Sequence, residues 1–236
     1  MSIESRSTDA TGQPGDINTM PRLTEPTFSF AQEDTVLLVV GPEQKLLIAH
    51  ESHLKLNSEF FQTALKTEWV QGQTRTINLP EDDTETMTNY LTFTYGRGLL
   101  TTSLVSMPVG GPQNGEWVLL AKLYVLGERL LDTPLRNAVV REILRIASLK
   151  DKEGYRYFVD AGASNTCYEG TPTGSLIRRL IVDEHVSAGQ KGWIDHDKDH
   201  PAFLWELSTA LLDKVATRQP YDEFVDCYLD VDDYLI

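Results

Sequence analysis

The sequence predicts an α+β fold, in which a small sheet packs against helices and a helical extension follows. Two short runs of branched apolar residues, Thr35–Val40 and Lys45–Ala49, are separated by Gly-Pro-Glu-Gln, as is typical of a hairpin. A third run, Thr74–Leu79, alternates polar and apolar residues as a strand does. Helical patterns lie on both sides of this third run. The order strand–strand–helix–strand–helix therefore favours an α+β domain.

The first 27 residues are predicted to form a disordered tail. They are rich in Ser, Thr, Asp, Gly and Pro and have almost no apolar periodicity. Such a segment buries too little apolar surface to offset the entropy that it would lose on ordering. We therefore place the start of the folded domain at residue 28.

The two hairpin strands are almost continuously apolar, which predicts burial on both faces. Asn57 or Ser58 is suited to capping the short helix that follows them. The predicted core residues are the apolar side chains at inward positions of these strands and helices: Val36, Val39, Ile48, Leu54, Phe60, Phe61, Ile77, Leu79, Tyr90 and Leu91.

Further helices are predicted from their end signals. Asp82 and Glu85 resemble a capping box before a helix that ends at Gly96, a residue suited to a left-handed cap. Glycines and prolines in residues 97–116 indicate a long surface loop. The run Trp117–Leu131 has helical apolar spacing. The next helix begins at Thr133 as its cap, with a buried stripe of Leu135, Ala138, Val139, Ile143 and Ile146.

Residues 149–175 contain many polar residues and glycines and are predicted to be a linker. Residues 176–236 are predicted to be a helical C-terminal extension. Within it, Leu176–Ala188 and Ala202–Thr217 are amphipathic, so each needs a partner surface to be stable. We expect the two helices to pack against each other and on the preceding domain. A last helix is expected within Tyr221–Ile236, where acidic and apolar residues alternate.

Composition restricts the possible functions. The formal net charge of −14 gives an acidic surface that repels phosphate backbones, so nucleic-acid binding is not expected. No apolar run approaches the roughly 20 residues of a membrane span, so no membrane partner is expected. Cys167 and Cys227 lie far apart and are interpreted as reduced thiols. These features indicate an intracellular protein, either cytoplasmic or nuclear.

The order of several short motifs across residues 28–148 resembles the BTB/POZ domain, a protein-interaction module. The residues that carry the resemblance are Asp34, Val36, Val39, Ala49-His50, Leu54, Ser58, Phe60-Phe61, Leu79-Pro80-Glu81-Asp82, Tyr95-Gly96, Leu120-Ala121-x-x-Tyr124 and Leu135-x-Asn137-Ala138. The segment Ser175–Asp183 followed by Gly192-Trp193 is similar to the extension of many fungal BTB proteins.

The resemblance implies protein–protein interaction, through dimerisation or as an adaptor that docks a partner on a cullin ubiquitin ligase. Glu51 and Asn57 depart from the family pattern, which has Lys and Arg there, and this departure argues against a corepressor-binding role. The hydrophobic-x-Glu element of cullin docking is not evident in residues 97–116. We therefore rank general protein interaction, including self-association, above cullin docking.

No combination of nucleophile, base and acid indicates catalysis, so neither an enzyme nor a cofactor is expected. His50 follows a buried strand and is interpreted as a structural residue. The alternative hypothesis is a metal-dependent hydrolase that uses the Asp195–His200 cluster. His196 and His200 would be its metal ligands, because two histidines at i and i+4 can share one helix face.

Overall fold

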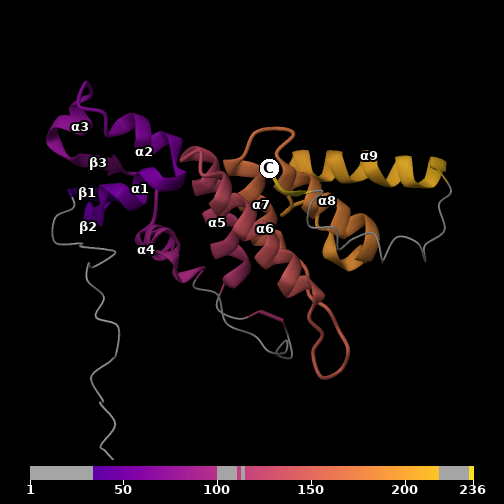
Figure 1. Ribbon diagram of the computed structural model, residues 1–236. Coiled ribbons are helices and arrows are strands. Elements are labelled where there is room, and N and C mark those ends of the chain that lie inside the picture. The colour runs from indigo at the N-terminus through magenta and orange to yellow at the C-terminus, as the bar shows by residue number, and fades with distance from the viewer. Residues whose placement is uncertain (1–33, 100–110, 113–114, 218–233) are drawn as a thin grey trace, which may run out of the picture. The chain divides into compact units, whose positions relative to one another are not determined.

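The computed structural model describes residues 34–99, 111–112, 115–217 and 234–236 of the 236-residue chain. Within these ranges the protein has an α+β fold, with one three-stranded sheet and a larger set of helices (Figure 1). The fold class predicted from the sequence is therefore confirmed. The predicted tail of residues 1–27 lies outside the described residues.

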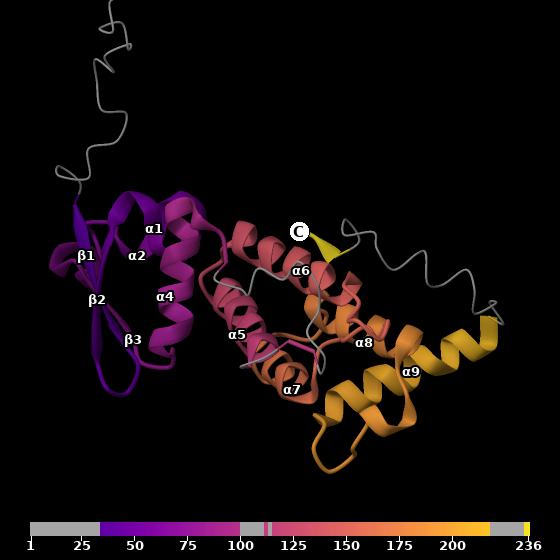
Figure 2. The same cartoon turned by 90° about the horizontal axis from the view of Figure 1, so that it is seen from below.

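The sheet consists of β1 (Thr35–Val40), β2 (Lys45–His50) and β3 (Thr76–Leu79), in the order β2-β1-β3. β1 pairs antiparallel with β2 and parallel with β3, so that Leu38 lies between Leu47 and Ile77. The helices α1 (Glu51–Asn57), α2 (Glu59–Ala64) and α4 (Thr84–Thr92) lie on one side of the strands (Figure 2).

The prediction that both faces of the hairpin are buried is wrong. Val36, Leu38 and Val40 of β1 point into the core and are fully buried. The alternate residue Val39 is only half-buried, and Ile48 of β2 is 71% exposed. An antiparallel pair covered by helices on one side leaves its other face open, even where that face is apolar.

Most of the other predicted core residues are confirmed. Leu54, Phe61, Ile77, Leu79 and Tyr90 are buried, and together with the inward residues of β1 they form the core of this region. The predicted core positions of Phe60 and Leu91 are wrong in part, since both side chains are half-buried and pack against the edge of the core.

Hydrogen bonds to neighbouring side chains cap the helices α2 and α4 of this region. Of the two candidate caps, Asn57 and Ser58, it is Ser58 that caps α2, and its hydroxyl accepts a hydrogen bond from the Phe61 N–H at 3.2 Å. The cap of α4 is Asp83 rather than Asp82, because the Asp83 carboxylate accepts a hydrogen bond from the Thr86 N–H at 2.8 Å. A short helix α3 (Val70–Thr74) precedes β3, and η2 (Phe93–Arg97) follows α4 with Gly96 in the left-handed conformation.

The second part of the chain is helical, with α5 (Glu116–Arg129), α6 (Thr133–Ser148), α7 (Ala161–Gly170), α8 (Leu176–Ala188), η3 (Lys191–Trp193) and α9 (Pro201–Thr217). The cap of α6 is Asp132 rather than Thr133, because its carboxylate accepts a hydrogen bond from the Leu135 N–H at 2.9 Å. Ala138, which was placed in the buried stripe of α6, is only half-buried, whereas Val139 is buried.

Residues 149–175 are more than a linker, because they contain α7, which packs against α5 (Figure 2). Asp160 caps this helix. The two helices approach so closely that a Cβ added at Gly170 would lie 2.5 Å from Val125 Cγ1. A helix rich in Ala, Gly and Ser allows this approach but carries a weak apolar pattern, which explains why the sequence reading missed it.

The expected packing of the two amphipathic helices is confirmed. α9 packs against α8, and their buried residues Ile177, Leu180, Ile181, Phe203 and Leu207 join those of α6 in one core. The predicted helix within Tyr221–Ile236 lies largely outside the described residues. Its last three residues dock on the fold, where the Tyr234 hydroxyl donates to Asp183 Oδ2 at 2.9 Å.

Candidate functional site

An apolar groove of about 450 Å³ lies between α2, the turn before α3, β3 and the turn between α5 and α6. It is lined by Glu59, Phe60, Thr63, Ala64, Trp69, Gln71, Ile77, Asn78 and Leu131. The lining residues come from four stretches of sequence, so that only the folded chain brings them together. A groove of this size accepts a few apolar side chains of another molecule.

Two neighbouring phenylalanines connect the groove to the core. Phe61 is fully buried and stacks on Tyr90, with ring centroids 6.2 Å apart. Phe60 lies edge-on to Phe61 at 5.2 Å and lines the groove. The Phe60 ring is therefore supported from below by a packed core, which fixes its position.

Two large apolar side chains of the groove face solvent. Trp69 is 54% exposed at the N-terminal cap position of α3, and Leu131 is 50% exposed after α5. Exposed apolar residues that surround a concave surface are typical of protein-binding sites. Tryptophan is also enriched among the residues that contribute most to binding energy.

Leu131 is held in an unfavourable backbone conformation. Its φ of 51° lies in the left-handed region, which costs an L-residue roughly 1–2 kcal/mol. The turn is a Schellman motif, in which the Asp132 N–H donates to Gly127 O at 2.9 Å and the Leu131 N–H donates to Glu128 O at 3.3 Å. Glycine is the usual residue at this position, so an exposed leucine with a backbone cost is a candidate functional residue.

Buried hydrogen bonds fix this turn against α2. The Ser58 hydroxyl donates to Leu130 O at 2.6 Å, and Ser58 also forms a β-bridge with Asp132. The Tyr90 hydroxyl donates to Asp132 Oδ2 at 3.2 Å. Burial raises the pKa of both Tyr90 and Asp132 above their ordinary values. The groove is therefore preformed, which lowers the entropic cost of binding.

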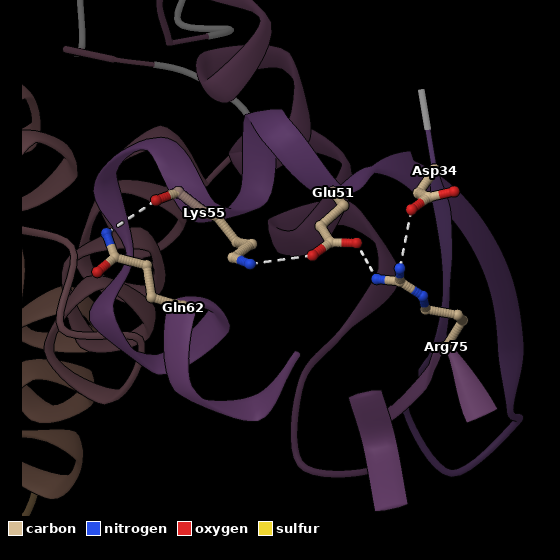
Figure 3. A network of polar contacts seen from close by, with 5 residues as sticks. All are labelled: Asp34, Glu51, Lys55, Gln62 and Arg75. Atoms are coloured by element: carbon tan, nitrogen blue, oxygen red, sulfur yellow. Dashed lines mark hydrogen bonds and ion pairs between the residues drawn. The ribbon is translucent and has the colours of Figure 1, made fainter. Parts of the chain in front are cut away.

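A network of ion pairs holds the sheet side of this region (Figure 3). The Arg75 guanidinium bonds both Glu51 and Asp34, the latter at 2.8 Å, and Lys55 bonds the other oxygen of Glu51 at 3.0 Å. Arg75 joins the starts of β1, α1 and β3. The sequence analysis missed Arg75 because its partners lie far away in sequence.

His50 has a structural role in the described part of the chain. Its Nδ1 lies 2.7 Å from the Tyr95 hydroxyl, and its backbone N–H donates to the same oxygen at 3.0 Å. The pair ties the end of β2 to η2. This arrangement agrees with the structural interpretation of His50.

The candidate metal ligands are only partly brought together. Potential ligand atoms of Asp195, His196 and Asp197 lie within 4.8 Å of one another, on an exposed turn where Asp195 is ion-paired with Lys198 at 2.7 Å. His200 has another role, because its Nδ1 accepts the Ala202 N–H at 3.1 Å. The geometry therefore does not favour a hydrolase that uses both His196 and His200.

No protein-family model matches this chain, and no curated protein matches it either. None of the helices in the described ranges is both long and apolar enough to cross a membrane. The function must therefore be argued from the groove and from the chemistry of the fold itself.

Proposed function

We propose that this chain is a protein–protein interaction module of the BTB/POZ type, which acts by self-association or as an adaptor. The observation that carries the proposal is the preformed apolar groove with Trp69 and Leu131 exposed at its surface. The BTB-like order of motifs and the α+β arrangement of residues 35–99 and 115–148 support the same function. An intracellular location, cytoplasmic or nuclear, is part of the proposal.

Binding at the groove would be driven by apolar burial. A partner side chain that enters the groove would contact Phe60, Ala64 and Ile77 below, with Trp69 and Leu131 around it. Truncation of a central tryptophan in such an interface costs about 2 kcal/mol or more, which is roughly a 30-fold loss of affinity. The free-energy cost of the left-handed backbone at Leu131 would then be offset by favourable binding energy only in the complex.

Two partners can be tested separately: a second copy of the chain, which we rank first, and a cullin scaffold. Sedimentation equilibrium measures self-association of the full chain, and titration calorimetry measures binding of a purified cullin N-terminal domain. We expect one of these interactions in the native chain. Trp69→Ala and Leu131→Asn should each weaken it, because both remove apolar surface, and Asn tolerates the left-handed backbone.

The matched control is Leu212→Asn on α9. Leu212 is 70% exposed and does not line the groove, so this variant should bind as the native chain does. A chain that stays monomeric and binds no cullin domain would contradict the proposal. Equal weakening by the groove variants and the α9 variant would also contradict it.

A further inference from the structure

A second cavity, of about 500 Å³, lies between the segment before α7 and the C-terminal turn of α8. It shares no lining residue with the groove. Five of its lining residues are aromatic: Tyr155, Tyr157, Phe158, His185 and Trp193. We call this cavity the aromatic pocket. Sites that bind small molecules are typically lined by apolar and aromatic side chains with a few polar groups among them.

The rings are held in place by neighbouring groups. Trp193 lies 5.7 Å from Phe158 and 6.0 Å from His185, measured between ring centroids. The Tyr157 hydroxyl donates to Asp151 Oδ2 at 2.7 Å. His185 Nδ1 lies 2.8 Å from the Ile181 carbonyl, which can only accept, so this nitrogen carries the proton. The faces of fixed aromatic rings are electronegative and attract cations.

The residues that line the pocket include one acidic side chain, Asp160, and one basic side chain, Arg156. Asp160 lines it and also caps α7, so the chain's own carboxylate already satisfies the start of that helix. Burial lowers the pKa of His185 and favours its neutral form, whereas the nearby Asp199 acts in the opposite direction. Arg156 also lines the pocket. Its side chain is exposed and carries a positive charge, opposite to that of Asp160.

Glu184 adds an unusual carboxyl group directly behind the pocket. Its side chain is only 2% exposed, and Oε2 accepts the N–H of the lining residue Val159 at 3.3 Å. Oε1 has no hydrogen-bond partner among the described residues. A buried polar atom without a partner is destabilising and requires an explanation. Burial raises the pKa of Glu184 to about 8, so at neutral pH this carboxyl keeps its proton and adds no charge to the pocket.

We propose that the aromatic pocket binds an organic cation, either a guanidinium or an alkylammonium group, between Trp193, Tyr157 and the Asp160 carboxylate. Trp193 provides the strongest cation–π surface, and Asp160 provides the opposite charge. The ligand is either a basic side chain of a protein or a small free cation. This inference does not depend on the groove or on the proposed function.

The test is a titration of the full chain with N-acetyl-arginine amide, followed by the NMR signal of the Trp193 indole N–H. N-acetyl-citrulline amide is the uncharged match and should cause no shift. Trp193→Ala should weaken arginine binding about 3- to 30-fold, from the usual strength of a cation–π contact; binding to this variant is followed by calorimetry. The control is Trp205→Ala, which changes an exposed tryptophan of α9 that does not line the pocket.

Two conservative variants test the sign of the ligand's charge even if Trp193→Ala fails to fold. Asp160→Asn keeps a capping side chain and should weaken binding, whereas Arg156→Gln should strengthen it by removing a like charge. Tighter binding of an arginine-containing peptide than of the amide would identify a protein side chain as the ligand, and equal binding would identify a small cation. Equal binding of citrulline, no binding of arginine, or weaker binding in Arg156→Gln would overturn the proposal.

Discussion

The groove and the aromatic pocket are similar in volume but differ in how they are built. The groove is formed by a helix, a strand and a tight turn, and its exposed residues are apolar. The pocket is formed largely by the irregular segment before α7, and its aromatic rings are accompanied by the carboxylate of Asp160. The comparison shows that one fold presents two surfaces that would respond to different conditions. In the two proposals, apolar burial would drive binding at the first surface, and charge would drive binding at the second.

The largest expected effect is on the free energy of unfolding. It distinguishes residues of the core below the groove from residues of the groove itself. Phe61→Ala should lower the free energy of unfolding by about 3–5 kcal/mol, because Phe61 is fully buried. Phe60→Ala should cost clearly less, since its ring is half-buried, and it should weaken partner binding. Urea unfolding measures both changes. Equal losses of stability would mean that Phe60 belongs to the core rather than to the binding surface.

The next effect concerns the pocket and depends on pH. Burial raises the pKa of Glu184 from 4.5 to about 8, so the folded state keeps a proton that the unfolded chain has already lost. Stability should therefore fall as pH rises between these two values, by up to about 1.4 kcal/mol per pH unit. Below the lower value the group contributes no pH dependence.

Glu184→Gln should remove this fall, because a glutamine does not titrate. Unfolding free energies measured at about pH 5 and about pH 8 test the expectation. The exposed Glu153→Gln is the control and should leave the pH dependence unchanged. If the unfolding free energy of Glu184→Gln depended on pH as that of the native chain does, another group would be responsible for the pH dependence of stability.

Salt should distinguish the two surfaces directly. Added salt screens charges over about 10 Å at 0.1 M and about 3 Å at 1 M. Binding of the arginine amide at the pocket should therefore weaken as salt is raised, whereas binding at the groove should change little. Titration calorimetry at low and high salt measures both. A groove interaction that weakens as strongly as the pocket interaction would remove the distinction.

The smallest effect is expected at the ion pairs beside the groove. Arg75→Gln breaks two ion pairs, with Asp34 and Glu51, and should cost about 1 kcal/mol because all three groups are partly exposed to solvent. Lys55→Gln breaks only the i,i+4 pair with Glu51 and should cost about 0.3–0.5 kcal/mol. Thermal unfolding of the two variants compares them. A larger loss of stability for Lys55→Gln than for Arg75→Gln would contradict this order.

Local patterns in the sequence were sufficient for many elements of the fold. The bounds of α8 agree with the predicted Leu176–Ala188, because its apolar stripe and polar flanks are both clear. The helix α7 was missed because small residues pack closely without a strong apolar pattern. Ile48 was misplaced because an apolar strand sequence does not reveal which face remains uncovered.

Neither binding surface could be predicted from local patterns. The groove joins Phe60, Trp69 and Leu131, whose proximity depends on tertiary packing. Leu131 also occupies a position where a glycine would have signalled the turn, so the motif carries no sequence marker. The proximity of Tyr157, His185 and Trp193 in the pocket likewise depends on tertiary packing.

The left-handed Leu131 has a consequence for the evolution of this chain. Replacement by glycine or asparagine would relieve a backbone cost of roughly 1–2 kcal/mol, so a library selected only for heat resistance should lose the leucine. A library selected for partner capture should recover it. The residue found at position 131 in such libraries therefore records which of the two selections acted on the chain.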